Sequence, residues 1–91
     1  HGVSPKFISS IQDMGYKNIT LDKAQELKDH GVNPEFISGV QKLGFKDLTL
    51  EKAQELRDHG VTVAYIQKVK SKNLSDIKTL DDYIKLRDTG F

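Results

Sequence analysis

The sequence predicts an all-α protein in which three tandem helical hairpins stack as a short right-handed solenoid or a compact helical array. The first observation is an internal repeat: residues 1–29 and 30–58 are identical at 18 of 29 positions, and His-Gly-Val begins at residues 1, 30 and 59. The second is that apolar residues recur at helical spacing, whereas no segment shows the period-two alternation of a strand. We therefore expect one domain, residues 1–91, with a first repeat at 1–29, a middle repeat at 30–58 and a last repeat at 59–91.

The first helix of each hairpin begins at a capping residue followed by proline. Ser4 offers a side-chain oxygen to the free amides of the first turn, and Pro5 suits the first helical position. Asn33-Pro34 repeats this arrangement. One helical stripe of apolar residues follows, consisting of Phe7, Ile8, Ile11 and Met14. The expected helix covers residues 5–14.

The second helix of the first repeat is expected over residues 21–30. It begins after Thr20, and Asp22 places an acid in the first turn, where the helix dipole favours it. Its apolar residues are Leu21, Ala24 and Leu27. By the same reasoning the remaining helices are expected over residues 34–43, 50–59, 63–72 and 80–89.

Each expected helix ends before a residue suited to the left-handed conformation. These residues are Gly15, Gly31, Gly44, Gly60, Asn73 and Gly90. In every case the next residue is apolar, and so is the residue five positions before that one, as in a Schellman terminus. We therefore predict positive φ at these ends, and at Gly31 and Gly44 in particular.

A stack of hairpins predicts where side chains are buried, because only the middle repeat has neighbours on both sides. The most buried residues should be Phe36, Ile37, Val40, Leu50, Ala53 and Leu56. Phe7 or Ile8 should be partly exposed. In the last repeat, Val63 replaces proline, Tyr83 replaces alanine, Thr89 replaces histidine, and one residue is inserted near Lys78. We interpret this divergent repeat as a C-terminal cap, with Tyr83 and Phe91 covering the outer end.

Composition excludes several classes of function. The net charge is only +1 and there is no cysteine, so the chain has no global field for nucleic acid and no thiol chemistry. No apolar run approaches the roughly 20 residues that cross a bilayer, and no signal peptide is visible. The chain begins at a His-Gly-Val triplet and ends where a fourth would begin, so we expect a segment of a longer protein.

Histidines and carboxylates are the candidate site residues, and structural roles explain both better. His30 and His59 end their helices, where an imidazole can bond free carbonyls and its cation suits the dipole. Glu26 and Glu55 have Lys23 and Lys52 at helical spacing, typical of solvated ion pairs. No phosphate loop, nucleophile elbow or zinc motif is present. We therefore predict no catalytic residue, no metal site and no cofactor.

One basic cluster favours an alternative. Lys68, Lys70 and Lys72, with Lys78 nearby, make the last repeat basic, at six bases against four acids, and Tyr65 and Tyr83 are expected close to them. A small helical domain that binds nucleic acid through this repeat is therefore the second hypothesis. The neutral or acidic first and middle repeats argue against it.

The stretches Leu27 to Phe36 and Leu56 to Tyr65 carry a pattern, Leu-Lys/Arg-Asp-His-Gly-Val-x-Pro-x-Phe/Tyr-Ile, with Val63 in place of proline. It resembles repeats of many bacterial proteins, among them C-terminal regions of membrane metallopeptidases similar to the beta-lactam-sensing antirepressor (BlaR/MecR) family. The resemblance covers the whole chain, most strongly through residue 61. It implies that any zinc-protease residues lie elsewhere in the parent protein, and that this segment lies outside the cytoplasmic membrane.

The expected function is that of a non-catalytic structural spacer or protein-interaction module in a larger bacterial protein, with a protein partner, no membrane insertion by this segment and a monomeric state. Repeated residues form the core, so a partner should be recognised by the positions that vary between repeats. Those positions in the first helices include Lys6/Glu35/Ala64, Ser10/Gly39/Lys68 and Asp13/Lys42/Ser71.

Overall fold

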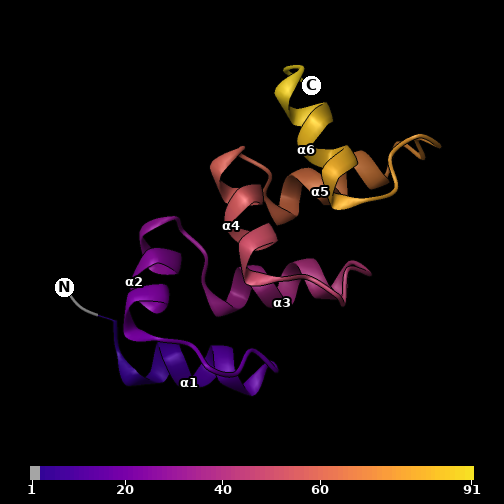
Figure 1. The fold of residues 1–91 in the computed structure, drawn as a ribbon. Coiled ribbons are helices and arrows are strands. Elements are labelled where there is room, and N and C mark those ends of the chain that lie inside the picture. The colour runs from indigo at the N-terminus through magenta and orange to yellow at the C-terminus, as the bar shows by residue number, and fades with distance from the viewer. Residues whose placement is uncertain (1–2) are drawn as a thin grey trace.

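The computed structural model describes residues 3–91, and these contain six α-helices and no strand. The helices are α1 (Pro5–Asp13), α2 (Leu21–Asp29), α3 (Pro34–Lys42), α4 (Leu50–Asp58), α5 (Val63–Lys70) and α6 (Leu80–Asp88) (Figure 1). The predicted all-α class and the predicted six helices are confirmed. Every helix begins at the expected residue and ends one or two residues earlier than expected.

Each helix begins at a side chain that accepts a hydrogen bond from a first-turn amide. The capping residues are Ser4, Thr20, Asn33, Thr49, Thr62 and Thr79. In α6 the carboxylate of Asp82 also accepts from the Thr79 amide, which completes a capping box. Because helices of eight or nine residues are marginal alone, such caps and the packing between hairpins stabilise them.

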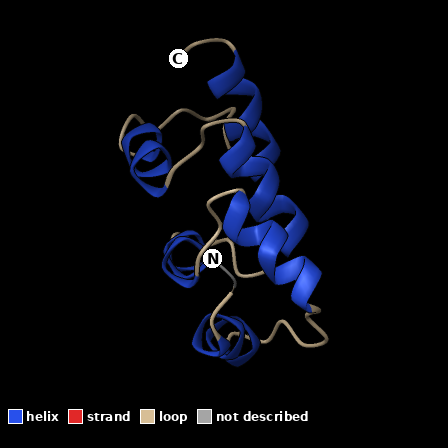
Figure 2. Cartoon of the chain, turned by 90° about the vertical axis from the view of Figure 1, so that its left-hand side faces the viewer, coloured by secondary structure: helices blue, strands red, loops and turns tan. Residues whose placement is uncertain are grey.

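The helices form two layers. α1, α3 and α5 lie side by side, and α3 contacts both of the others. α2, α4 and α6 follow one another in a second layer, as Figure 2 shows. Successive hairpins are displaced in one direction, so the molecule is elongated, with extents of 40 × 22 × 17 Å.

The helix ends have the predicted left-handed residues but fall into two kinds. Gly31 and Gly44 have φ of 80° and 109°, and the other four predicted end residues also have positive φ. At α2 the Val32 amide donates to the Leu27 carbonyl at 2.8 Å, and α4 has the same bond from Val61. That bond, the mark of a Schellman terminus, occurs at these two of the six described helix ends.

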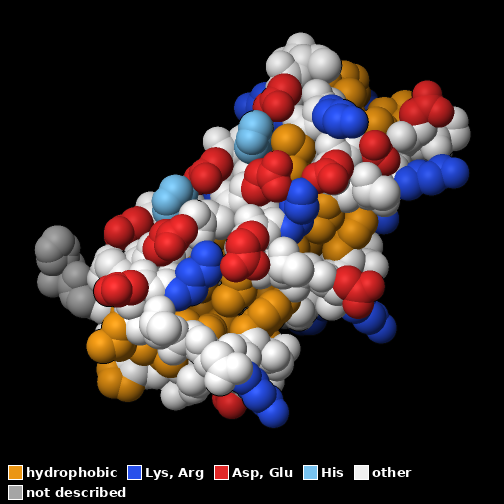
Figure 3. Space-filling model, viewed as in Figure 1, with side chains coloured by type: hydrophobic (Ala, Val, Ile, Leu, Met, Phe, Trp, Pro, Cys, Tyr) orange, Lys and Arg blue, Asp and Glu red, His pale blue; other side chains and the backbone are white. Residues whose placement is uncertain are grey.

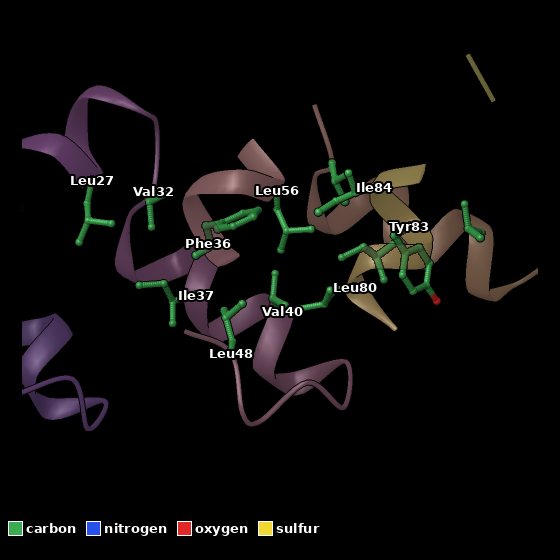
Figure 4. Packing of buried hydrophobic residues seen from close by; sticks show 14 of the residues in the cluster. Leu27, Val32, Phe36, Ile37, Val40, Leu48, Leu56, Leu80, Tyr83 and Ile84 are labelled. Carbon is green, nitrogen blue, oxygen red and sulfur yellow. The ribbon is translucent and has the colours of Figure 1, made fainter. Parts of the chain in front are cut away.

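A continuous row of apolar side chains passes through all three repeats between the layers (Figure 4). As predicted, the middle repeat contributes more of it than either neighbour, while Phe7 and Ile8 are partly exposed. Its buried members there are Val32, Phe36, Ile37, Val40, Leu48, Ala53 and Leu56.

Two expectations about packing are wrong. Leu50 is partly exposed, because it packs against the buried row without being enclosed by it. Tyr83 does not cover the outer end: its ring is 2% exposed and packs edge-on against Phe45 of the middle repeat, with centroids 5.9 Å apart. Phe91, by contrast, is 50% exposed at the end of the chain.

Candidate functional site

His30 and His59 each join one helical hairpin to the next. His30 caps the end of α2 and is therefore counted with the first repeat, and His59 caps the end of α4 and is counted with the middle one. Nδ1 of His30 lies 2.6 Å from Oδ1 of Asp58, and Nδ1 of His59 lies 2.9 Å from Oδ1 of Asp88. Hydrogen bonding to the aspartate raises the pKa of each histidine above its ordinary value of 6.5, and the carboxylate charge adds to this effect. Figure 3 shows both histidines beside acidic side chains along one edge of the molecule.

The helix-end position of these histidines is as predicted, but the partner is not. Sequence reasoning paired each imidazole with carbonyls of its own helix, whereas Nδ1 contacts an aspartate of the following repeat. The sequence does contain a signal for this contact, because aspartate and histidine recur together with the period of the repeat. Residues that recur with the period of a stack are candidates for contacts between its units.

Arg57 of α4 lies at the junction between the first and middle repeats. Its guanidinium lies 5.3 Å from the centre of the Phe36 ring of its own hairpin, within the range of a cation–π interaction. The same group lies against the end of α2, because a Cβ added to Gly31 would approach Nη2 of Arg57 to 2.9 Å. Glycine at this position therefore provides both a left-handed backbone and space for the arginine.

Arg87 occupies the equivalent place at the junction between the middle and last repeats. It lies 5.7 Å from the centre of the Tyr65 ring, and its Nε donates a hydrogen bond to the Gly60 carbonyl at 3.4 Å. The four-residue pattern Arg-Asp-His-Gly at 57–60 thus serves two junctions. Arginine and aspartate contact the preceding repeat, and histidine and glycine contact the following one.

Lysines of the second helices make a parallel set of contacts. Nζ of Lys23 lies 3.9 Å from Glu26, as predicted, and 3.8 Å from Glu51 of the next repeat. Nζ of Lys52 likewise pairs with Glu55 of its own helix and with Asp81 of the next. Hydrogen bonds to Asp81 and Glu55 raise the pKa of Lys52. Because these pairs are open to solvent, they contribute little to the free energy of unfolding, and their main effect is to orient one hairpin relative to the next.

Several of the non-repeated positions that we expected to recognise a partner lie together on α3. Glu35, Gly39 and Lys42 line a shallow groove of about 350 Å³. The other lining residues are Met14, Pro34 and Ser38. The groove therefore has an apolar side, contributed by Met14 and Pro34, and one charge of each sign. Its α1 and α5 counterparts Lys6, Asp13, Ala64, Lys68 and Ser71 are exposed.

A second groove of about 480 Å³ lies between the loops that precede α4 and α6. Phe45, Leu48 and Leu80 form its apolar part, and Lys46, Asp47, Lys52, Lys78 and Asp81 supply its charged groups. Because Lys52 and Asp81 already pair with each other there, this groove is part of the junction between the middle and last repeats.

The structure separates the basic cluster of the last repeat. The ammonium group of Lys70 lies 5.3 Å from the centre of the Phe45 ring, toward the middle repeat. That of Lys72 lies 5.9 Å from the centre of the Phe91 ring, at the end of the chain. Lys70 and Lys72 thus lie beside different aromatic rings, Tyr83 is buried, and Lys78 borders the groove between the loops that precede α4 and α6.

Among residues 3–91, no group of three or more histidine, aspartate or glutamate side chains is placed to hold a metal ion. Within the same residues, no helix is long and apolar enough to span a membrane. What the described residues do show is a small all-α protein whose recurring polar residues join successive hairpins. No family model, curated protein or solved structure matches this chain.

Proposed function

We propose that the chain is a non-catalytic helical repeat module that serves as a spacer and protein-binding surface within a larger bacterial protein. The observation that supports the proposal is that recurring and varying residues lie in different places. Those that recur between repeats are used at the junctions, as with the His30–Asp58 and His59–Asp88 pairs. Several of those that vary between repeats lie at the surface, and Glu35 and Lys42 among them line the α3 groove.

A spacer must hold its two ends apart, and two features support this role. The molecule is elongated, and each junction combines apolar packing with side-chain pairs that fix one hairpin relative to the next. A side-chain pair that crosses a junction orients the units even where its net contribution to stability is small. The resemblance to repeats of membrane metallopeptidases supports a bacterial signalling peptidase as parent protein, with this module outside the cytoplasmic membrane.

A protein-binding role is supported by the chemistry of the α3 groove. Met14 and Pro34 offer apolar area, while Glu35 and Lys42 offer one acid and one base for orientation. Apolar contact with a polar rim is the usual composition of a protein interface. At about 350 Å³ the groove accommodates a few side chains of a partner, such as one face of a helix.

Site-specific photo-cross-linking in bacterial cells tests this function. A photoreactive residue is placed at Glu35 or Lys42, and at exposed Lys17 as the control, since lysine also occupies its repeat equivalent, Lys46. We expect a discrete protein adduct at the groove positions and none at Lys17. Adducts at all three positions, or at none, contradict the proposal.

A gel-retardation assay tests the nucleic-acid alternative directly. The proposed function predicts no shift of DNA or RNA by the chain at physiological salt. Salt-sensitive binding that is lost when Lys68, Lys70 and Lys72 are replaced by glutamine would instead establish the alternative.

A further inference from the structure

The first residue of each second helix becomes progressively more buried along the chain. Leu21 of α2 is 70% exposed, Leu50 of α4 is partly exposed, and Leu80 of α6 is 9% exposed. Leu80 borders the same groove as Leu48 of the middle repeat, so it is covered by the preceding hairpin. Leu21 is a large apolar side chain at the same place in a repeat for which no preceding hairpin is described.

Two acids of α2, one near each end of the helix, occupy positions that elsewhere pair with the preceding hairpin. Asp22 is equivalent to Glu51 and Asp81, which contact Lys23 and Lys52 respectively. Asp29 is equivalent to Asp58 and Asp88, whose partners are the two described histidines. Both Asp22 and Asp29 are exposed, and Asp29 accepts a hydrogen bond from Nε2 of Gln25 in its own helix at 2.8 Å. The first repeat thus presents the two acids of the junction seen twice within the chain, with Lys28 in place of the arginine.

The outer face of the last repeat lacks the complementary half. Thr89 replaces the histidine and donates a hydrogen bond to the Leu86 carbonyl at 2.6 Å. Asp82 replaces the lysine, and its carboxylate accepts from the amides of Lys78 and Thr79 at 2.9 Å each. Both replacements are bonded within their own repeat, and an acid at position 82 would repel Asp22 of a second copy.

We propose that the face formed by Leu21, Asp22 and Asp29 binds a further helical hairpin of this same repeat type. The complementary hairpin carries a lysine on its second helix to meet Asp22 and ends that helix in His-Gly to meet Asp29. Charge complementarity and continuity with the two existing junctions define this occupant. The stack accepts hairpins at the first repeat and ends at the last.

Thiol labelling in an extended chain tests the proposal. The natural chain has no cysteine, so Leu21→Cys creates a single reporter thiol. A copy of residues 30–58 joined ahead of His1 supplies a hairpin in register, with His1-Gly2 as the His-Gly pair that follows its second helix in the sequence. We expect the extension to slow labelling at position 21 by about tenfold or more, as burial in a stable junction requires. An unchanged labelling rate would overturn the proposal.

Two matched variants test the stated chemistry. Replacing the copied Lys52 by glutamate in the extension should weaken the protection of position 21, because two acids then face each other. Equal protection by both extensions overturns the charge-based recognition. Leu74→Cys reports on the opposite end, because Leu74 is the repeat equivalent of Tyr16 and Phe45, which contact the following repeat. Its labelling should not change on extension ahead of His1.

Extension at the other end tests the direction of growth. A copy of residues 33–61 joined after Phe91 should leave labelling at Leu74→Cys unchanged, and the 91-residue chain should sediment as a monomer. Protection of position 74 as strong as that of position 21, or head-to-tail association of the unmodified chain, overturns the proposal.

Discussion

The junction between the first and middle repeats and the junction between the middle and last repeats share their polar pairs but not their packing. Both have an imidazole on an aspartate, a lysine that contacts an acid of the following second helix, and an arginine that lies against the end of the preceding hairpin while covering an aromatic ring of its own. The side-chain pairs between second helices are thus the same at both junctions, whereas the contacts made by the loops and the first helices differ between them. The comparison indicates that the polar pairs set the geometry within which the packing can vary.

The aromatic residue after each first helix shows one such change. The hydroxyl of Tyr16 donates to the Leu48 carbonyl at 2.5 Å and accepts from Nε2 of Gln41 at 2.9 Å, and burial raises its pKa. At the second junction the equivalent residue is Phe45, which packs edge-on against Tyr83. A polar anchor at the first junction is therefore replaced by an aromatic contact at the second, using the tyrosine that stands in the alanine position.

A second change joins two positions that vary together. At the second junction a Cβ added to Gly39 would approach Cγ2 of Val63 to 2.8 Å, so glycine makes room for the branched side chain. By repeat position, the first junction has Ser10 and Pro34 in their places. Loss of the proline in the last repeat is thus accommodated by loss of a side chain in the middle one.

Removal of the second junction should have the largest effect. Deletion of residues 59–91 uncovers the middle repeat and leaves 58 residues, whose small core barely offsets chain entropy. We expect the truncated chain to lose cooperative thermal unfolding in circular dichroism. Cooperative melting at the temperature of the full chain would show that the repeats fold independently of one another.

Loss of the contact between Phe45 and Tyr83 should have the next largest effect on stability. Tyr83→Ala restores the residue of the other repeats but leaves a cavity beside Phe45, and should cost about 3–5 kcal/mol of unfolding free energy. Tyr16→Phe, which removes only the hydroxyl at the first junction, should cost about 1 kcal/mol. Urea unfolding of both variants measures the difference, and equal losses would mean that the two junctions are anchored alike.

The pair of Gly39 and Val63 should show coupling. Gly39→Ser forces a side chain onto Val63 and should cost about 1–3 kcal/mol. Adding Val63→Pro, at a first helical position that tolerates proline, should recover part of this loss. A double-mutant cycle should give a coupling of at least about 0.5 kcal/mol, and strictly additive effects would refute the compensation.

Replacement of the helix-ending glycines by alanine should reveal a smaller difference in stability between the two junctions. Gly31 and Gly60 both have positive φ, so alanine should cost about 1 kcal/mol at either. At Gly31 the added methyl also meets the Arg57 guanidinium, whereas at Gly60 the nearest Arg87 atom is 3.6 Å away. We expect Gly31→Ala to lower the melting temperature more than Gly60→Ala. The reverse order would show that Arg57 moves aside freely.

The smallest effect is a dependence on pH that both junctions share. His30 and His59 have folded-state pKa values raised by Asp58 and Asp88, so the folded state binds protons more tightly than the unfolded one. Their contribution is fully present below the ordinary pKa of 6.5 and is lost as pH rises through the raised values. Unfolding free energy should therefore fall modestly between about pH 6 and pH 8.

Asparagine variants provide the control for this prediction. Asp58→Asn should remove the part of the pH dependence that comes from His30, and Asp88→Asn the part that comes from His59. If the slope persists in the double variant, the histidine pairs are not its source.

Local signals in the sequence predicted the helices well, because the caps and the left-handed residues act within a few positions of each other. Ser4, Thr20 and Gly31 are examples whose roles depend on backbone groups nearby. The two kinds of helix end were not distinguished. After Gly31 the chain turns directly into α3, whereas after Gly15 it enters a longer loop, and this later path decides whether the next amide reaches back.

Contacts between repeats were predicted less well, because sequence spacing does not specify the offset between helices of neighbouring hairpins. Lys23 and Glu26 were paired correctly within one helix, but Glu51 and the aspartate partners of the histidines lie about one repeat away. Tyr83 was assigned to the outer end because the direction of its side chain depends on that same offset. Three of the non-repeated positions, Glu35, Gly39 and Lys42, border one groove, and their role in binding a partner stays a prediction.

The Arg-Asp-His-Gly pattern has a consequence for the chain while it is being made. A ribosome adds about 5–20 residues per second, so one repeat takes about 2–6 seconds to follow another. The aspartate and arginine that complete the end of α2 or α4 belong to the repeat that emerges next. The local backbone bonds at the ends of α2 and α4 need no later residue, but the contacts of His30 and His59 form only after the next hairpin has emerged. In the last repeat Thr89 bonds within its own repeat, so the end of α6 has no histidine that needs a later partner.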